Sequence, residues 1–285
     1  MSDVPRDIVF TRYAASRGVT WMRDAALMFG RARARWLLLL LAYYVILAAA
    51  RALPFVGVVA VSVLKPVLAV GFLAAAWTVE RGGKPRLRHI AQGFQSNLRA
   101  LLPIGVAFAV GIFIAVLASA LVDHGKLLAF LTTAAPASAD GDTAGVDAAE
   151  GVFLDPGVEL GMLFAALCSL PVLLAVWFAP ALVVFQDLRA SQALATSLRA
   201  AVANWRALAV YAMALFVVAG IMPTLLVAVL SFALSAFPPG VRAVLTWGVV
   251  LPYIAVVAAI VQIADYVSYR DVFHAGETLA PLSRH

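Results

Sequence analysis

Two short stretches, Asn97-Leu98-Arg99-Ala100-Leu101 and Asn204-Trp205-Arg206-Ala207-Leu208, repeat one pattern, and each opens a long uncharged apolar run. A third apolar block begins at Trp36 and also follows an arginine-rich segment. Uncharged runs of about 20 residues or more are typical of membrane-spanning helices. The pattern therefore predicts a polytopic all-α membrane protein, built as a threefold repeat of an amphipathic helix followed by a helical hairpin.

The composition of the chain also indicates a lipid environment. Hydrophobic residues make up 64% of its 285 positions and charged residues only 13%, whereas an average soluble domain has about 45–50% and about 25%. The formal net charge is +6, which in a soluble protein would suggest nucleic acid. Here the basic residues flank apolar runs, so membrane orientation accounts for them and nucleic-acid binding is not expected.

The first apolar block, residues 36–79, is too long for a single membrane span. Its 44 residues would form a helix of about 66 Å, twice the ~30 Å thickness of the hydrocarbon core. The chain must fold back, and the segment Arg51-Ala52-Leu53-Pro54-Phe55-Val56-Gly57 has the charge, proline and glycine typical of a turn. The block therefore predicts two transmembrane helices, at 36–53 and 56–79.

Four further apolar runs bring the expected number of spans to six. They cover residues 100–122, 160–186, 207–237 and 244–264. Pro171 and Pro180 lie inside the run at 160–186 and predict kinks, because membrane helices tolerate proline where neighbours satisfy the freed carbonyl groups. We expect the whole chain, 1–285, to form one integral membrane domain.

Polar-faced segments separate the apolar blocks. Helical periodicity predicts amphipathic surface helices at 19–35, 87–99 and 190–205. Residues 1–35 are expected to form a cytoplasmic tail that ends in the first of these helices. An acidic segment at 123–159 is expected to be an external loop, and residues 265–285 a short cytoplasmic tail.

The distribution of basic residues predicts the orientation in a bacterial inner membrane. Of the 21 lysines and arginines, 17 lie in the N-terminal tail, in the segments at 80–99 and 189–206 and in the C-terminal tail, against four on the opposite side. Short loops rich in these residues stay in the cytoplasm, so both termini are expected inside. Contacts with anionic lipid headgroups are expected from Arg31, Arg33, Arg35, Arg86, Arg88, Arg99, Arg199 and Arg206.

Lys65 is the most unusual residue of the apolar blocks, because it lies about a third of the way into a predicted span. An ionisable group at that depth is a candidate functional residue. The alternative, which the sequence favours, is a lysine that extends to the outer headgroups where Pro66 opens the helix. As a functional residue, Lys65 would line a cavity of a transporter or channel.

Five polar residues lie near the cytoplasmic ends of the even-numbered spans: Glu80, Gln186, Asp187, Gln262 and Asp265. Their three acids occupy matching depths and would collect cations if they ringed the mouth of a cavity. Sequence proximity instead favours structural ion pairs with the basic residue that follows each span, which would join Glu80 to Arg81, Asp187 to Arg189 and Asp265 to Arg270.

The sequence offers no catalytic constellation. The four histidines are scattered, the single cysteine, Cys168, lies in an apolar run, and no phosphate-binding loop or metal-ligand spacing occurs. We therefore expect neither enzymatic activity nor a cofactor, a metal site or a catalytic residue.

Segments Gly18–Val79, Leu87–Val122 and Leu194–Arg270 resemble a family of proteobacterial inner-membrane proteins of unknown function. The resemblance rests on the arginine-rich lead into each hairpin, on Leu-Pro-Phe-Val-Gly at 53–57 and on Lys-Pro-Val-Leu-Ala-Val-Gly at 65–71. More distantly, the chain is similar to the membrane domain fused to some glycerophosphodiester phosphodiesterases, without their catalytic domain. The resemblance implies architecture only, and it assigns no activity or site residue.

Two functions are compatible with these observations. The first is a membrane accessory or organising protein that binds lipid or partner proteins, or another copy of itself. The second is a small-solute or lipid transporter or channel with a cavity near Lys65 and the cytoplasmic-end acids. A transporter needs a hydrated path, and because the predicted spans hold few polar residues besides Lys65, the sequence favours the first function.

Overall fold

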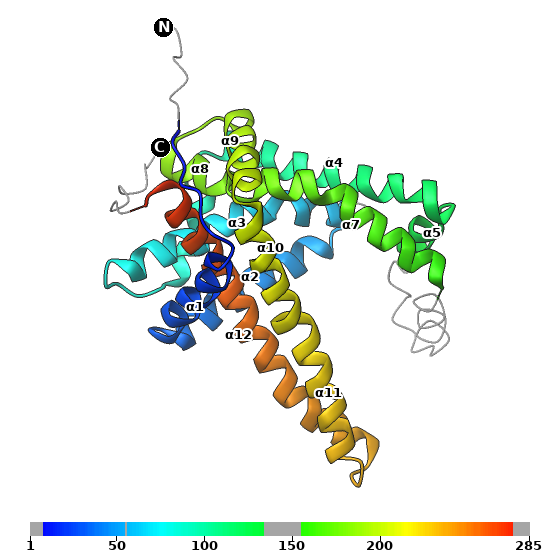
Figure 1. The fold of residues 1–285 in the computed structure, drawn as a ribbon. Helices are drawn as coiled ribbons and strands as arrows, with labels where there is room; N and C mark the ends of the chain where they lie inside the picture. Colours follow the sequence, from blue (N-terminus) through cyan, green and yellow to red (C-terminus); the bar gives the residue numbers. More distant parts are fainter. Residues whose placement is uncertain (1–7, 55, 134–154, 276–285) are drawn as a thin grey trace, which may run out of the picture.

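A computed structural model describes residues 8–54, 56–133 and 155–275, and these ranges are helical and contain no strand (Figure 1). Six candidate membrane spans occur within them, which confirms the expected all-α chain. The spans are α2 (Arg33–Arg51), α3 (Gly57–Glu80), α4 (Leu98–Asp123), α7 and α8 (Pro156–Trp177 and Ala179–Gln186), α10, η2 and α11 (Trp205–Leu215, Phe216–Ile221 and Met222–Ala233), and α12 (Pro239–Phe273).

The expected external loop lies largely outside the described residues. Of 123–159, the structure describes the short helix α5 (Lys126–Thr133) and the start of α7. The described part of the C-terminal tail belongs to α12, which is 35 residues long. A helix of that length extends about 52 Å, more than the hydrocarbon core requires, so α12 continues beyond the membrane at one end or both.

The spans form three hairpins, α2–α3, α4–α7 and α10/α11–α12. The last two diverge from a shared packed end, which we call the base (Figure 1). The base contains α1 (Arg17–Gly30), α8, α9 (Ala190–Ala203) and the C-terminal part of α12. The largest fully buried side chains gather there, among them Trp21, Trp36, Phe72, Phe178 and Tyr266.

Away from the base, the hairpins expose large apolar side chains. No residue of α11 is buried, and Phe232 and Leu121 are 84% and 80% exposed. In water such a surface would be unfavourable, whereas lipid tails solvate it as well as another helix does. The main hydrophobic core therefore lies in the base, with a small second cluster where α5 packs on α7. Lipid is the expected environment of the diverging hairpins.

The three segments that lead into the hairpins differ in structure. Helices α1 and α9 are α-helices of 14 residues, whereas the segment expected to form an amphipathic α-helix at 87–99 contains a seven-residue 3₁₀ helix, η1 (Leu87–Gly93). Tight packing explains the difference, because Gly71 of α3 touches the backbone of Ile90 and Gly93 touches the backbone of Val67. The apolar spacing of the segment is compatible with both helix types, so the sequence pattern could not distinguish them.

A buried histidine, His89, caps the N-terminus of η1. The backbone N–H of Arg86 donates to Nδ1 of His89 at 3.0 Å, and Nε2 of His89 lies 3.5 Å from the hydroxyl of Thr78. Burial, together with the nearby guanidinium groups of Arg88 and Arg86, lowers the pKa of His89. The imidazole therefore serves as a neutral hydrogen-bonding group in this turn.

The proline-containing span at 156–186 breaks at Phe178, two residues before Pro180, instead of only kinking. Helix α7 keeps Pro171 inside it, but the chain leaves the helix at Phe178 and α8 begins one residue later. The Ser197 hydroxyl of α9 bridges the break, accepting from the Phe178 N–H at 2.9 Å and donating to the Leu174 carbonyl at 3.0 Å. These are the two backbone groups that a continuous helix would have joined, so both remain satisfied inside the protein.

Substituting Gly93 by alanine tests the close contact between η1 and α3. A Cβ atom at Gly93 would overlap the Val67 carbonyl oxygen, so the substitution should destabilise the fold by about 1–3 kcal/mol, as overpacking usually does. The measurement is the unfolding free energy in detergent micelles. Gly248→Ala in α12 is the matched control, because no atom lies within 4 Å of its new Cβ. Equal stability of both variants would contradict the packing described.

Candidate functional site

A cavity of about 310 Å³ lies where the three hairpins meet. Residues of α2, α3, α4, α7, α8, α10 and α12 form its walls, so segments far apart in the sequence contribute to it. Three of the six polar candidates, Lys65, Gln262 and Asp265, line this cavity. Its volume is at the lower end of the range typical of small-ligand sites.

Lys65 contributes a positive charge to the cavity. It lies in the first half of α3, just before the buried Pro66, and its ammonium nitrogen is 5.9 Å from the ring centroid of Phe108 in α4. That distance permits a cation–π interaction. Lys65 is therefore held against an aromatic side chain of the cavity wall, whereas a lysine that only reaches for headgroups requires no such contact.

Asp265 contributes a negative charge from α12. It lines the cavity together with Tyr43, Tyr211 and Gln262. Across the described ranges, no ion pair reaches Asp265. The expected pairing with Arg270 is wrong, because Arg270 binds two other carboxylates.

Two aromatic residues beside Asp265 carry polar atoms that lack partners. Tyr211, only 2% exposed, and Trp177 pack edge to face with ring centroids 5.6 Å apart. Among the described residues, neither the Tyr211 hydroxyl nor the Trp177 Nε1 has a hydrogen-bond partner, although both atoms are buried. Both side chains line the cavity. An unsatisfied buried polar group is unfavourable, so these atoms are suited to a bound molecule or water.

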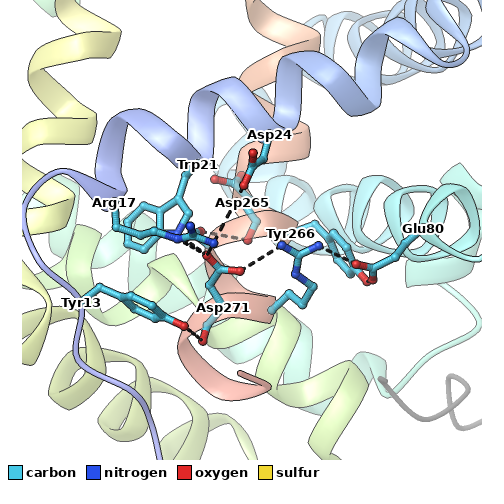
Figure 2. Close-up of polar contacts among 10 residues, drawn as sticks. Tyr13, Arg17, Trp21, Asp24, Glu80, Asp265, Tyr266 and Asp271 are labelled. Atoms are coloured by element: carbon cyan, nitrogen blue, oxygen red, sulfur yellow. Dashed lines mark hydrogen bonds and ion pairs between the residues drawn. The ribbon is translucent and has the colours of Figure 1, made fainter. Parts of the chain in front are cut away.

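A second polar cluster lies in the base and joins α1 to α12 (Figure 2). The Asp271 carboxylate is its centre, with a side chain 6% exposed. Arg17 binds Oδ2 of Asp271 through Nη2 at 2.6 Å and Nε at 2.7 Å, and Trp21 Nε1 donates to the same oxygen at 3.0 Å. Arg270 binds Oδ1 at 3.0 Å. The carboxylate is thus surrounded by donors, as a buried charge requires.

The base cluster continues to α3 through Arg270. The other Arg270 nitrogen binds Oε1 of Glu80 at 2.5 Å, and the Tyr266 hydroxyl donates to Oε2 (Figure 2). On the α1 side, the Tyr13 hydroxyl donates to the Asp271 carbonyl at 3.0 Å, and burial together with the Asp271 charge raises the pKa of Tyr13. Sequence proximity predicts an ion pair between Glu80 and Arg81. In the structure, Glu80 pairs with Arg270, which is 190 residues away in the sequence.

The remaining polar candidates lie elsewhere. Gln186 ends α8, with its Nε2 3.5 Å from Nε2 of His274. Asp187 follows with a positive φ of 53°, and it lines a surface depression beside Asn97 and Arg99. The three acids thus have different neighbours, and of the three it is Asp265 that lines the cavity.

The arginines expected at the lipid headgroups are all exposed. Arg206 lies over the ring of Trp205, with its guanidinium carbon 5.5 Å from the centroid. The exposed set comprises Arg31, Arg33, Arg35, Arg86, Arg88, Arg99, Arg199 and Arg206. Their exposure makes contacts with headgroups sterically possible, and these contacts stay a prediction.

Among curated proteins, the chain is similar to one from Burkholderia thailandensis described as "Probable inner membrane protein", with 28% identity over 274 residues, 94% of this chain and 95% of the relative. No family model matches the chain, and no solved structure matches it. The relative and the six apolar helices support a multi-pass inner-membrane protein. The relative's description mentions no phosphodiesterase, so that more distant resemblance stays a prediction.

Replacing Asp271 by asparagine tests the base cluster. The change removes the negative charge that both Arg17 and Arg270 bind, and it should destabilise the protein by roughly 2–4 kcal/mol. The expected loss is smaller than for a fully buried ion pair, because the two arginine side chains are 33% and 26% exposed. The readout is the unfolding free energy in micelles. Asp155→Asn is the control, since its pair with Lys126 is more exposed and asparagine retains the helix cap. An equal loss in both variants would argue against a central role for Asp271.

Proposed function

We propose that this membrane protein binds a small polar solute or a lipid headgroup in the cavity between its hairpins and acts in its transport. The observation that carries the proposal is the assembly of Lys65, Gln262, Asp265, Tyr43 and Tyr211 around one cavity. Ionisable groups within membrane spans commonly mark substrate or ion pathways. The proposed role is binding and passage, without a chemical reaction.

The cavity supports transport more than the accessory role that the sequence favours. An accessory protein was favoured because the spans hold few polar residues. Those few are nevertheless concentrated by the fold, since α2, α3, α10 and α12 each contribute a polar side chain to the same cavity. Polar side chains gathered around an internal cavity favour a binding site inside the protein. A scaffold for partner proteins would instead need polar or aromatic groups on its outer surface.

We also propose that the base lies on the cytoplasmic side. The Thr11 N–H donates to the Val272 carbonyl at 2.7 Å, so the first and last described segments share one end of the molecule. The exposed arginines of the lead-in segments would then meet the anionic inner leaflet, which attracts basic residues. Anionic lipids are accordingly proposed as partners of the base.

Fusions of alkaline phosphatase test this orientation. The enzyme is active only outside the cytoplasm, so a fusion after Phe237, between α11 and α12, should be active, and a fusion after Ala275 should be inactive. A C-terminal green fluorescent protein should be fluorescent as the complementary control. The opposite pattern of activities would reverse the proposed orientation.

Cysteine accessibility tests whether water reaches the cavity. In a Cys168→Ser background, Ala69→Cys places a thiol on the cavity wall and Val229→Cys places one on the exposed apolar surface of α11. A charged methanethiosulfonate reagent reacts with thiolates in water and very slowly in lipid. Ala69→Cys should therefore react faster, by about tenfold or more.

Two comparisons complete this experiment. Lys65→Met in the Ala69→Cys background should slow the reaction with a negatively charged reagent more than with a positively charged one, because it removes the attracting charge. If Ala69→Cys reacted as slowly as Val229→Cys, the cavity would be dry and the transport proposal would fail.

A further inference from the structure

The inner part of the cavity combines aromatic walls with a carboxylate that forms no ion pair to any residue described by the structure. Asp265 shares the cavity wall with Tyr43 and Tyr211, and Trp177 packs perpendicular to Tyr211, with an angle of 87° between the ring planes. All four side chains line the same space. Proteins bind organic ammonium groups with a carboxylate and with the faces of aromatic rings.

We propose that Asp265, Tyr43, Tyr211 and Trp177 form a binding site for an organic ammonium group. This inference rests on the proposed function, because it names the chemical class of ligand that the cavity takes. The carboxylate supplies charge and the rings supply cation–π attraction, and both interactions are stronger in a site that excludes most water. An inorganic cation such as Na⁺ would use the oxygen atoms of Asp265, Gln262, Tyr43 and Tyr211. The NaCl comparison in the test below separates the two classes of cation.

The unpartnered polar atoms fit a ligand of this class. The Tyr211 hydroxyl accepts a hydrogen bond as well as donating one, so an N–H of a primary ammonium satisfies it. The Trp177 Nε1 only donates, and it suits a hydroxyl or ester oxygen next to the ammonium. Both atoms are buried without partners among the described residues. A ligand with an ammonium and a neighbouring oxygen, such as an ethanolamine unit, therefore matches the site.

Lys65 does not neutralise this site. Both α3 and α12 end in the base, where Glu80 binds Arg270. Lys65 precedes Glu80 by 15 residues and Asp265 precedes Arg270 by five, so along the helix axes Lys65 lies about 15 Å farther from the base. No ion pair joins the two residues in the described part of the chain. A cation at Asp265 is thus remote from the lysine.

An ammonium group of this kind has two sources, a soluble amine and the headgroup of phosphatidylethanolamine. Purified protein in maltoside micelles distinguishes them. The soluble arm titrates ethanolamine and choline and follows tryptophan fluorescence, with NaCl at matched ionic strength. The lipid arm adds phosphatidylethanolamine or phosphatidylglycerol and counts retained lipid by native mass spectrometry.

Binding of either ammonium source, with about tenfold or greater weakening in Asp265→Asn, is the expected result. Saturable binding of ethanolamine or choline identifies a soluble amine, and selective retention of phosphatidylethanolamine identifies the lipid. Trp177→Leu should weaken binding as well. Tyr211→Phe keeps the ring and should retain binding of choline. Asp265→Glu keeps the charge and should restore binding if asparagine disturbs the fold.

Asp155→Asn is the matched control, because it removes a more exposed carboxylate outside the cavity by the same substitution and should leave affinity unchanged. The inference is overturned if neither source binds better than NaCl or phosphatidylglycerol, or if Asp265→Asn binds as tightly as the wild-type protein. In that case, fast labelling of Ala69→Cys would still support a hydrated transport cavity, so failure of the ammonium site is distinguishable from failure of the proposed function.

Discussion

The arrangement of the helices depends on the contacts that the Asp271 carboxylate makes. It binds Arg17 and Trp21 of α1 and Arg270 of its own helix, and Arg270 extends the contact to Glu80 of α3. The diverging hairpins contribute little burial, because lipid solvates their apolar surfaces as well as protein does. Directional polar contacts in the base therefore determine how the helices meet, while apolar packing fills the space around them.

The same two helices carry both polar clusters, which links the base to the cavity. On α3, Glu80 belongs to the base and Lys65 to the cavity; on α12, Arg270 belongs to the base and Asp265 to the cavity. The Glu80–Arg270 ion pair fixes the relative position of these helices along their axes. It thereby sets the depths at which the two cavity charges lie, and any movement of α12 against α3 would change both clusters together.

The fold class and the six spans could be predicted because hydropathy and length decide them. The hydrogen-bond and ion-pair partners of individual side chains could not be predicted, because they depend on how the helices pack against one another. The matching motifs at Asn97 and Asn204 show this: Asn97 caps α4 by accepting from the Ala100 N–H at 3.2 Å, whereas Asn204 binds the N-terminal segment, accepting from the Tyr13 N–H at 2.8 Å and donating to the Thr11 carbonyl at 3.0 Å. Two stretches that match at four of five positions thus acquire different roles from their partners.

The cavity was only partly predictable for the same reason. Lys65 and Asp265 stood out as charges near or within apolar runs, but a one-dimensional pattern favours the nearest oppositely charged neighbour, which for Asp265 was Arg270. That neighbour is drawn away by Asp271 and Glu80, which surround its guanidinium group more completely. Asp265 forms no ion pair within the described ranges and lines the cavity with Tyr43 and Tyr211. In the ammonium proposal, the contacts of Arg270 in the base are the reason that this carboxylate is free to bind a ligand.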